Sequence, residues 1–193
     1  MSCSSPCDAP ERARRQAVLA LVSVAALGAV QAARAMAAPA EVARELPGAR
    51  AVGHGRLRYL GLHVYDATLW AVGTLNADEI ERSLVALELR YARALRGPLI
   101  AERSLAEMRR VGEFGDTEGQ RWLDAMKALF PDVSAGDRVT GVQRPGEGAR
   151  FHVNGRFIGE VSDAAFARLF FGIWLSPRTS QPKLRAALLG ASA

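Results

Sequence analysis

Residues 53–73 read GHGRLRYLGLHVYDATLWAVG, the longest run in the chain that is typical of β-structure throughout. We expect this run to form two strands or one long bent strand. Because successive side chains of a strand point to opposite faces, counting in twos places Leu60 and Leu62 on the face of Arg58. Tyr59 falls on the other face. An arginine that opens an apolar row stays charged, so it needs a carboxylate partner, a route to solvent or an anionic ligand.

Further β-structure is expected in two places. Residues 83–91 alternate between apolar and polar side chains, and Tyr91 ends the apolar row. Residues 137–161 contain two turns, and the second of them, Asn154–Gly155, is a dipeptide preferred in two-residue type I′ turns. We therefore expect a three-stranded antiparallel meander in this part of the chain.

Helical patterns lie between and after these strands. Residues 97–114 have a proline in the first turn and the mixed charges of a solvated face. Ser162–Asp163 has the composition of a helix cap, and the apolar helix that follows contains Trp174. Residues 38–52 predict a strand and a turn. Together the elements indicate an α+β fold in which an antiparallel sheet is covered by helices on one side.

The N-terminus has the composition of a secretory signal peptide. Three arginines precede an uncharged apolar run at residues 17–30, and small residues suit cleavage after Ala35 or Ala37. The run is shorter than the roughly 20 apolar residues that a membrane span needs. We therefore predict a cleaved signal peptide over residues 1–37 and one domain over residues 38–193. The location would be periplasmic or secreted, with no stable membrane span after signal removal.

Composition and motifs argue against several classes of function. The net charge of +5 comes from arginines scattered among acids, without a basic stripe, so no nucleic-acid partner is expected. The motifs of phosphate loops, zinc proteases, serine hydrolases and dinucleotide sites are absent. Both cysteines, Cys3 and Cys7, precede the apolar run, and the three histidines are isolated. We therefore expect no disulfide, no metal site and no cofactor.

Three segments carry a resemblance to a known family by their order and spacing. They are GxGxLRYxGLxVYDAxLW at residues 53–70, LELRY at residues 87–91, and a segment at residues 136–190 that contains FxxxFFxIWL. In this order they resemble the bacterial chalcone-isomerase-like family over about residues 41–190. The resemblance implies the open-faced β-sandwich of chalcone isomerases, in which helices cover a large antiparallel sheet and a ligand cleft lies between them.

The resemblance also implies a chemistry for the cleft. Plant enzymes of this fold close the flavanone ring with an arginine, a tyrosine, an asparagine and two hydroxyl residues, whereas plastid relatives hold a fatty-acid carboxylate with an arginine and a tyrosine. Arg58 is the best match for the arginine, and Arg50 is the second. The polar set that would position a chalcone is missing, because its other four positions fall near Leu60, Ile100, Glu107 and Ile173.

We therefore predict an exported, non-catalytic protein that binds a small apolar carboxylic acid such as a fatty acid. Arg58 would hold the carboxylate through two parallel hydrogen bonds, and its alternative role is an ion pair with Glu88 or Asp66. Two other functions stay open: an isomerase or lyase of the chalcone isomerase type with a rearranged site, and a protein-interaction scaffold with a collapsed cleft. The predicted ligand-binding residues are Arg58, Tyr59, Leu60, Leu62 and Tyr91.

Overall fold

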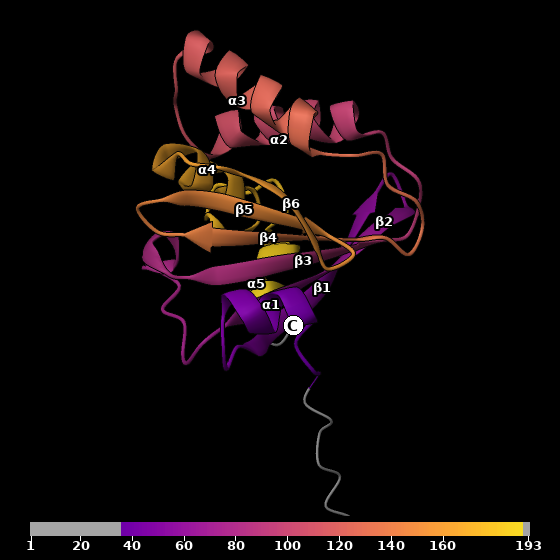
Figure 1. The fold of residues 1–193 in the computed structure, drawn as a ribbon, viewed down its shortest axis with the longest axis vertical. Helices are drawn as coiled ribbons and strands as arrows, with labels where there is room; N and C mark the ends of the chain where they lie inside the picture. The colour runs from indigo at the N-terminus through magenta and orange to yellow at the C-terminus, as the bar shows by residue number, and fades with distance from the viewer. Residues whose placement is uncertain (1–35, 191–193) are drawn as a thin grey trace, which may run out of the picture. The chain divides into compact units, whose positions relative to one another are not determined.

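The computed structural model describes residues 36–190. Their six strands form one antiparallel sheet in which each strand pairs with the next along the chain (Figure 1). The predicted signal peptide at residues 1–37 lies almost wholly outside the described residues, as do Cys3 and Cys7. The strands are β1 (Arg50–Tyr59), β2 (Leu62–Ala71), β3 (Val85–Tyr91), β4 (Arg138–Arg144), β5 (Gly148–Val153) and β6 (Arg156–Val161).

The stretch that opens the sheet forms two strands, β1 and β2, joined by a two-residue turn. Both turn residues have positive φ angles, 49° for Leu60 and 79° for Gly61, and Tyr59 pairs with Leu62 across the turn. These features identify a type I′ turn, whose twist matches the right-handed twist of the strands. We call residues 58–62 the hairpin tip.

The side chains of β3 alternate between the two faces of the sheet, as its sequence predicts. Leu87, Leu89 and Tyr91 are buried in the main core. Glu88 belongs to the other face, where it accepts a 3.0 Å hydrogen bond from Trp70 Nε1. The central strand therefore gives the sheet an apolar face toward the large helices and a more polar face behind it.

The predicted meander is confirmed in strands β4, β5 and β6. Val153 pairs with Arg156 across the second turn. Asn154 and Gly155 have φ angles of 50° and 85°, the left-handed conformation that a type I′ turn needs and that this dipeptide favours.

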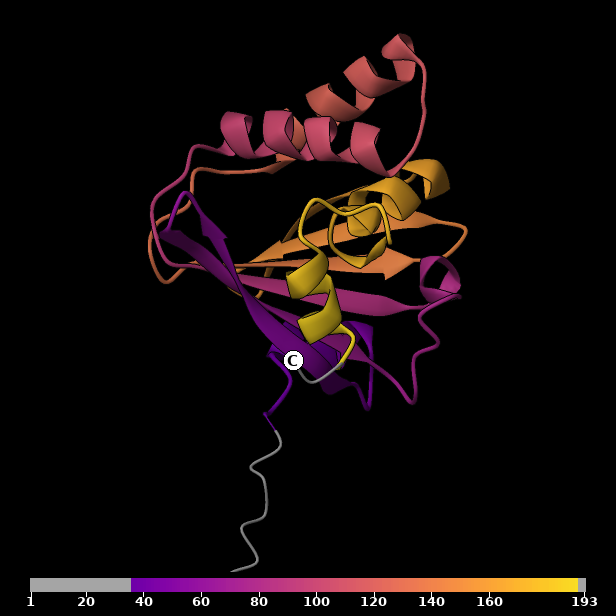
Figure 2. The same cartoon turned by 180° about the vertical axis from the view of Figure 1, so that it is seen from behind.

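Most of the helices cover one face of the sheet (Figures 1 and 2). Helix α4 (Ala164–Leu175) packs on β4 and β5, α2 (Gly97–Val111) packs on α4 and on α3 (Asp116–Leu129), and α5 (Pro182–Leu188) packs on β1. As predicted, Asp163 caps α4, because its carboxylate accepts hydrogen bonds from the backbone N–H groups of Ala165 at 2.9 Å and Phe166 at 3.0 Å. A short 3-10 helix, η1 (Ile80–Arg82), connects β2 to β3 and contacts α4.

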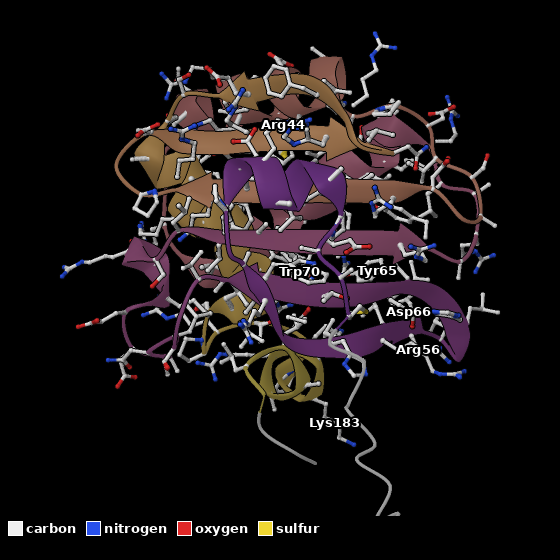
Figure 3. All side chains as sticks on the ribbon, turned by 60° about the horizontal axis from the view of Figure 1, so that its bottom comes forward. Arg44, Arg56, Tyr65, Asp66, Trp70 and Lys183 are labelled. Carbon is white, nitrogen blue, oxygen red and sulfur yellow. The ribbon has the colours of Figure 1, made fainter. Side chains whose placement is uncertain are left out.

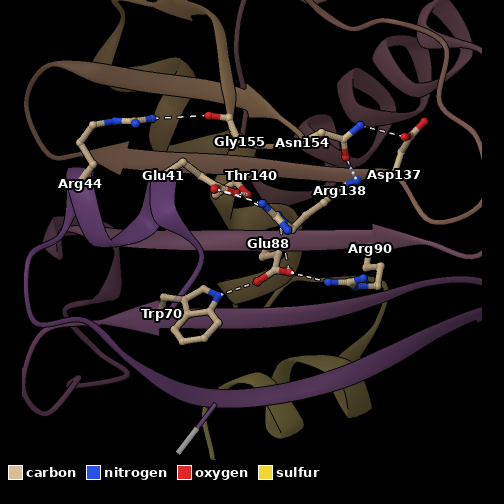
Figure 4. A network of polar contacts seen from close by, with 10 residues as sticks. All are labelled: Glu41, Arg44, Trp70, Glu88, Arg90, Asp137, Arg138, Thr140, Asn154 and Gly155. Carbon is tan, nitrogen blue, oxygen red and sulfur yellow. Dashed lines mark hydrogen bonds and ion pairs between the residues drawn. The ribbon is translucent and has the colours of Figure 1, made fainter. Parts of the chain in front are cut away.

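Helix α1 (Ala40–Glu45) lies on the opposite face of the sheet (Figure 3). The strand expected at residues 38–52 therefore begins later, at Arg50. Val42 packs against Trp70 in a small second core, and Glu41 accepts hydrogen bonds from Arg138 at 2.9 and 3.1 Å (Figure 4). These tertiary contacts stabilise a helix that is too short to be stable alone.

The observed architecture is the predicted α+β arrangement, an open antiparallel sheet with its large helices on one side. Helix α1, on the other side of the sheet, was not predicted. Within residues 36–190, no helix combines the length and the apolar character that crossing a bilayer requires.

Candidate ligand-binding cavity

A cavity of about 480 Å³ lies between the sheet and helices α2 and α4. This volume falls within the roughly 300 to 1,000 Å³ that small-molecule sites occupy. Its walls are mainly apolar, so burial of an apolar ligand there is favourable. The sheet contributes Leu57, Leu87, Leu89 and Val139 to the lining, and the helices contribute Ile100, Phe170 and Ile173. The cleft is therefore open, and nothing in it supports the collapsed cleft of a scaffold.

The cavity opens beside the hairpin tip. Tyr59 on β1, Arg93 in the loop after β3, and Leu99 and Arg103 on α2 all line the cavity and are exposed. We call these four residues the cavity mouth. The Arg103 guanidinium lies 5.9 Å from the centroid of the Tyr59 ring, so the end of β1 and the first turns of α2 meet here (Figure 2).

Two tyrosines of the sheet, Tyr65 and Tyr91, line the cavity. Their rings meet edge to face with centroids 5.8 Å apart, and Trp174 Nε1 donates a 2.9 Å hydrogen bond to the Tyr65 hydroxyl. Burial raises the pKa of both phenols well above their ordinary value, because a phenolate is poorly solvated in an apolar wall. Both tyrosines therefore stay protonated at neutral pH and can donate a hydrogen bond.

One carboxylate, that of Glu107 on α2, lies at the cavity wall. Its side chain is 9% exposed, and its Oε1 atom lies 2.6 Å from Arg103 Nη2. Arg110 Nε lies 3.5 Å from the other oxygen, Oε2, which has no hydrogen-bond partner in the described part of the chain. Two arginines against one carboxylate leave a net positive charge at this edge, which favours an anionic ligand group.

The structure places two of the five predicted ligand-binding residues in the cavity lining and three outside it. Tyr59 and Tyr91 line the cavity. Arg58, Leu60 and Leu62 are exposed and lie outside the lining. The Arg58 Nη1 atom donates a 3.4 Å hydrogen bond to the carbonyl oxygen of the turn glycine. Arg58 thus does not open an apolar row that faces a ligand, and its expected placement is corrected.

The turn and an irregular pairing of β1 with β2 explain why Arg58, Leu60 and Leu62 lie outside the cavity lining. Leu60 and Gly61 belong to the type I′ turn, so side-chain alternation does not run on from β1 into β2. The pairing also shifts between Leu57 and Arg58, which leaves Val64 of β2 without a partner in β1. Counting in twos across the whole stretch therefore assigned the wrong faces.

The alternative role predicted for Arg58, an ion pair with Glu88 or Asp66, is also wrong. Asp66 accepts a 2.7 Å hydrogen bond from Arg56 at the same end of the sheet (Figure 3). Glu88 accepts its hydrogen bond from Trp70 on the back face (Figure 4). Arg58 is a solvated arginine of the hairpin tip.

Three of the four positions that the family resemblance placed in the cleft do line the cavity. Ile100, Glu107 and Ile173 all line the cavity, whereas Leu60 does not. The sequence reasoning missed Arg103, which it assigned to a solvated helix face. The signal was present, because Ile100 and Glu107 lie three residues before and four residues after Arg103, and this spacing puts all three on one face of α2.

Within residues 36–190, no cluster of three or more histidine, cysteine, aspartate and glutamate side chains could hold a metal ion. His63 lies 3.2 Å from Asp66, and His152 lies 3.5 Å from Glu45. Each of these histidines is thus beside a single carboxylate.

Comparison with known proteins agrees with the fold. The family model described as chalcone isomerase-like matches residues 99–190. An uncharacterized protein of Haemophilus influenzae is 32% identical over 139 residues, which cover 72% of this chain and 67% of that protein. The crystal structure of a fatty-acid binding protein of Arabidopsis thaliana has a TM-score of 0.59 at 17% identity, covers 75% of this chain and 88% of its own, and thus shows likeness of fold. The chain belongs to the chalcone isomerase-like family.

Proposed function

We propose that this protein binds a small apolar carboxylic acid, such as a fatty acid, without transforming it. The observation that carries this proposal is a mainly apolar cavity whose mouth holds two arginines. An acyl chain would lie along the apolar walls, and its carboxylate would meet the positive charge at the mouth. The similarly folded Arabidopsis protein is described as a fatty-acid binding protein, which supports this ligand class.

The carboxylate would be anchored by Arg103 and Arg93 rather than by Arg58. Both line the cavity and are exposed at its mouth, so each guanidinium can bind a ligand carboxylate that is still partly solvated. Arg103 shares the Glu107 carboxylate with Arg110, so this trio keeps one positive charge. The phenols of Tyr59 and Tyr91 can add hydrogen bonds to the same group.

The polar groups of the cavity suit binding better than turnover. The Tyr65 hydroxyl already accepts from Trp174, and Glu107 is held by two arginines. The observation in favour of an isomerase or lyase is the buried Glu107 carboxylate, which faces the same cavity as two protonated phenols and could accept a proton. Cyclisation of a chalcone that is lost in Glu107→Gln would establish this second function.

Calorimetric titration with a long-chain fatty acid tests the binding proposal. Arg103→Gln should weaken binding roughly 10- to 100-fold, because a hydrogen bond to a charged group contributes about 1.5 to 3 kcal/mol. Arg110→Gln is the matched control, since Arg110 pairs with the same carboxylate and is similarly exposed but lies outside the lining. Equal affinities of the two variants would remove Arg103 as the anchor, and an absence of binding by the unmodified protein would reject the proposed function.

We also propose that the protein is exported after cleavage of residues 1–37. The arginines, apolar run and small residues of that segment support this. Intact-mass measurement on protein from its native compartment should show a chain that begins after Ala35 or Ala37. A chain that retains Met1 would reject export by this route.

A further inference from the structure

The hairpin tip carries a residue that the fold does not explain. Leu60 adopts a positive φ of 49° and is 85% exposed, so a leucine occupies a conformation that leucine disfavours while burying little surface. The turn between β5 and β6 has the same type I′ geometry and uses Asn154 and Gly155, the residues that this geometry favours. Leu60 therefore does not stabilise the folded domain.

Exposed apolar side chains gather at this end of the sheet. Of the eight large apolar residues that are exposed in the described part of the chain, four belong to the hairpin tip or the adjacent cavity mouth. A cluster of this kind, surrounded by polar residues, marks an interaction surface. These four residues are Tyr59, Leu60, Leu62 and Leu99.

Exposed arginines lie on the same segments as this apolar cluster or next to them. Arg58 on the tip, and Arg93 and Arg96 on the loop that leads into α2, are exposed. None of the three takes part in the ion pairs found among residues 36–190. That loop is joined to the hairpin by a 2.9 Å hydrogen bond from Ala92 N to Val64 O, and Figure 2 shows the two segments side by side. The surface thus combines projecting leucines with unpaired positive charge.

We propose that the hairpin tip and the cavity mouth dock on the surface of a bilayer that contains anionic phospholipid. Leu60 and Leu62 would insert below the headgroups, while Arg58 and Arg96 would meet lipid phosphates, since apolar tips combined with basic residues bind such surfaces. The cavity mouth then faces the bilayer, so an apolar acid can pass between membrane and cavity without crossing water. This use rests on the proposed function, but the docking itself does not require a ligand.

Sedimentation with vesicles tests the docking directly. The protein should bind vesicles of phosphatidylglycerol and phosphatidylcholine at low salt. It should bind pure phosphatidylcholine vesicles more weakly, and high salt should reduce binding to the mixed vesicles, because salt screens the attraction between exposed charges. Absence of binding to the mixed vesicles at low salt overturns the proposal.

One variant separates docking from folding. Leu60→Asn should raise the thermal midpoint by about 2 to 4 °C, because asparagine tolerates positive φ better than leucine. The same variant should lower the vesicle partition coefficient about tenfold, because it removes one inserted leucine. Leu84→Asn is the control. Leu84 is also exposed, but it lies just before the first residue of β3, at the end of that strand away from the hairpin tip. The Leu84→Asn variant should therefore bind vesicles as well as the unmodified protein does.

The outcomes distinguish this proposal from its alternatives. Leu60→Asn protein that binds vesicles like the unmodified protein overturns it. The proposal is also overturned if the unmodified protein is a dimer in gel filtration and the Leu60→Asn variant is a monomer, because the hairpin tip would then contact a second copy of the chain. Fatty-acid titration in solution should give the same affinity for Leu60→Asn as for the unmodified protein, because Leu60 lies outside the cavity lining. Vesicle binding without any fatty-acid binding would therefore reject the proposed function and leave the docking in place.

Discussion

At the scale of single residues, Trp174 reports on the cavity. It lines the cavity, whereas Trp70 and Trp122 lie outside the lining. We expect ligand binding to change the emission of Trp174, because an apolar ligand replaces water beside its indole ring. The ligand-dependent change should disappear in Trp174→Phe and persist in Trp122→Phe, while calorimetry shows that both variants still bind. A change that persists in Trp174→Phe would mean that the ligand binds elsewhere.

Single residues also show where sequence reasoning succeeds. The cap at Asp163 and the turn at Asn154–Gly155 depend on the chemistry of the residues themselves, and both were predicted correctly. The turn at Leu60–Gly61 was not recognised, because leucine is not a residue that favours positive φ. Together with the register shift between Leu57 and Arg58, this unrecognised turn led to the wrong placement of Arg58, Leu60 and Leu62.

At the scale of elements, α1 depends on ion pairs with the back of the sheet. Glu41 is fully buried and its partner Arg138 is partly exposed. Glu41→Ala should lower the free energy of unfolding by about 3 kcal/mol, since it removes the buried partner that accepts hydrogen bonds from Arg138 and Thr140. Glu147→Ala is the control, because its pair with Arg144 is exposed, and its effect should stay below about 1 kcal/mol. Urea unfolding measures both, and equal effects would contradict a structural role for Glu41.

The same helix should make stability sensitive to acid. Burial lowers the pKa of His152 below 6.5, against the opposing effect of Glu45, so the folded state favours the neutral ring. The contribution of His152 to the free energy of unfolding is therefore complete above pH 6.5. It is lost as the pH falls from 6.5 to the pKa of His152 in the folded state. Burial would raise the pKa of Glu41, but hydrogen bonds from Arg138 and Thr140 lower it below 4.5. This second contribution is present above pH 4.5 and is lost at lower pH.

The elements also show what sequence reasoning could not reach. Alternation predicted the two faces of β3, and helical periodicity predicted α4, because each pattern runs over a whole element. Helix α1 is six residues long, too short for a period, and it forms through contacts with distant strands. The cavity mouth has the same origin, since Tyr59 and Arg103 meet only when β1 and α2 have packed.

At the scale of the whole molecule, the last helix rests on the first strand. A side chain at Gly53 would collide with the carbonyl oxygens of Ala187 and Leu188. Gly53→Ala should therefore lower the free energy of unfolding by about 1 to 3 kcal/mol, as overpacking does. Gly115→Ala is the control, because Gly115 has open space around it and a negative φ. Similar urea midpoints for the two variants would mean that α5 does not press on β1.

The contact between α5 and β1 also sets an order of events during biosynthesis. All six strands lie in chain order, so each can pair with its predecessor as soon as it leaves the ribosome. Strand β1 is the earliest of them, yet its covering helix α5 follows all six strands in the chain. The nascent sheet can thus be complete while its first strand is still uncovered, and β1 is covered only once α5 has been made.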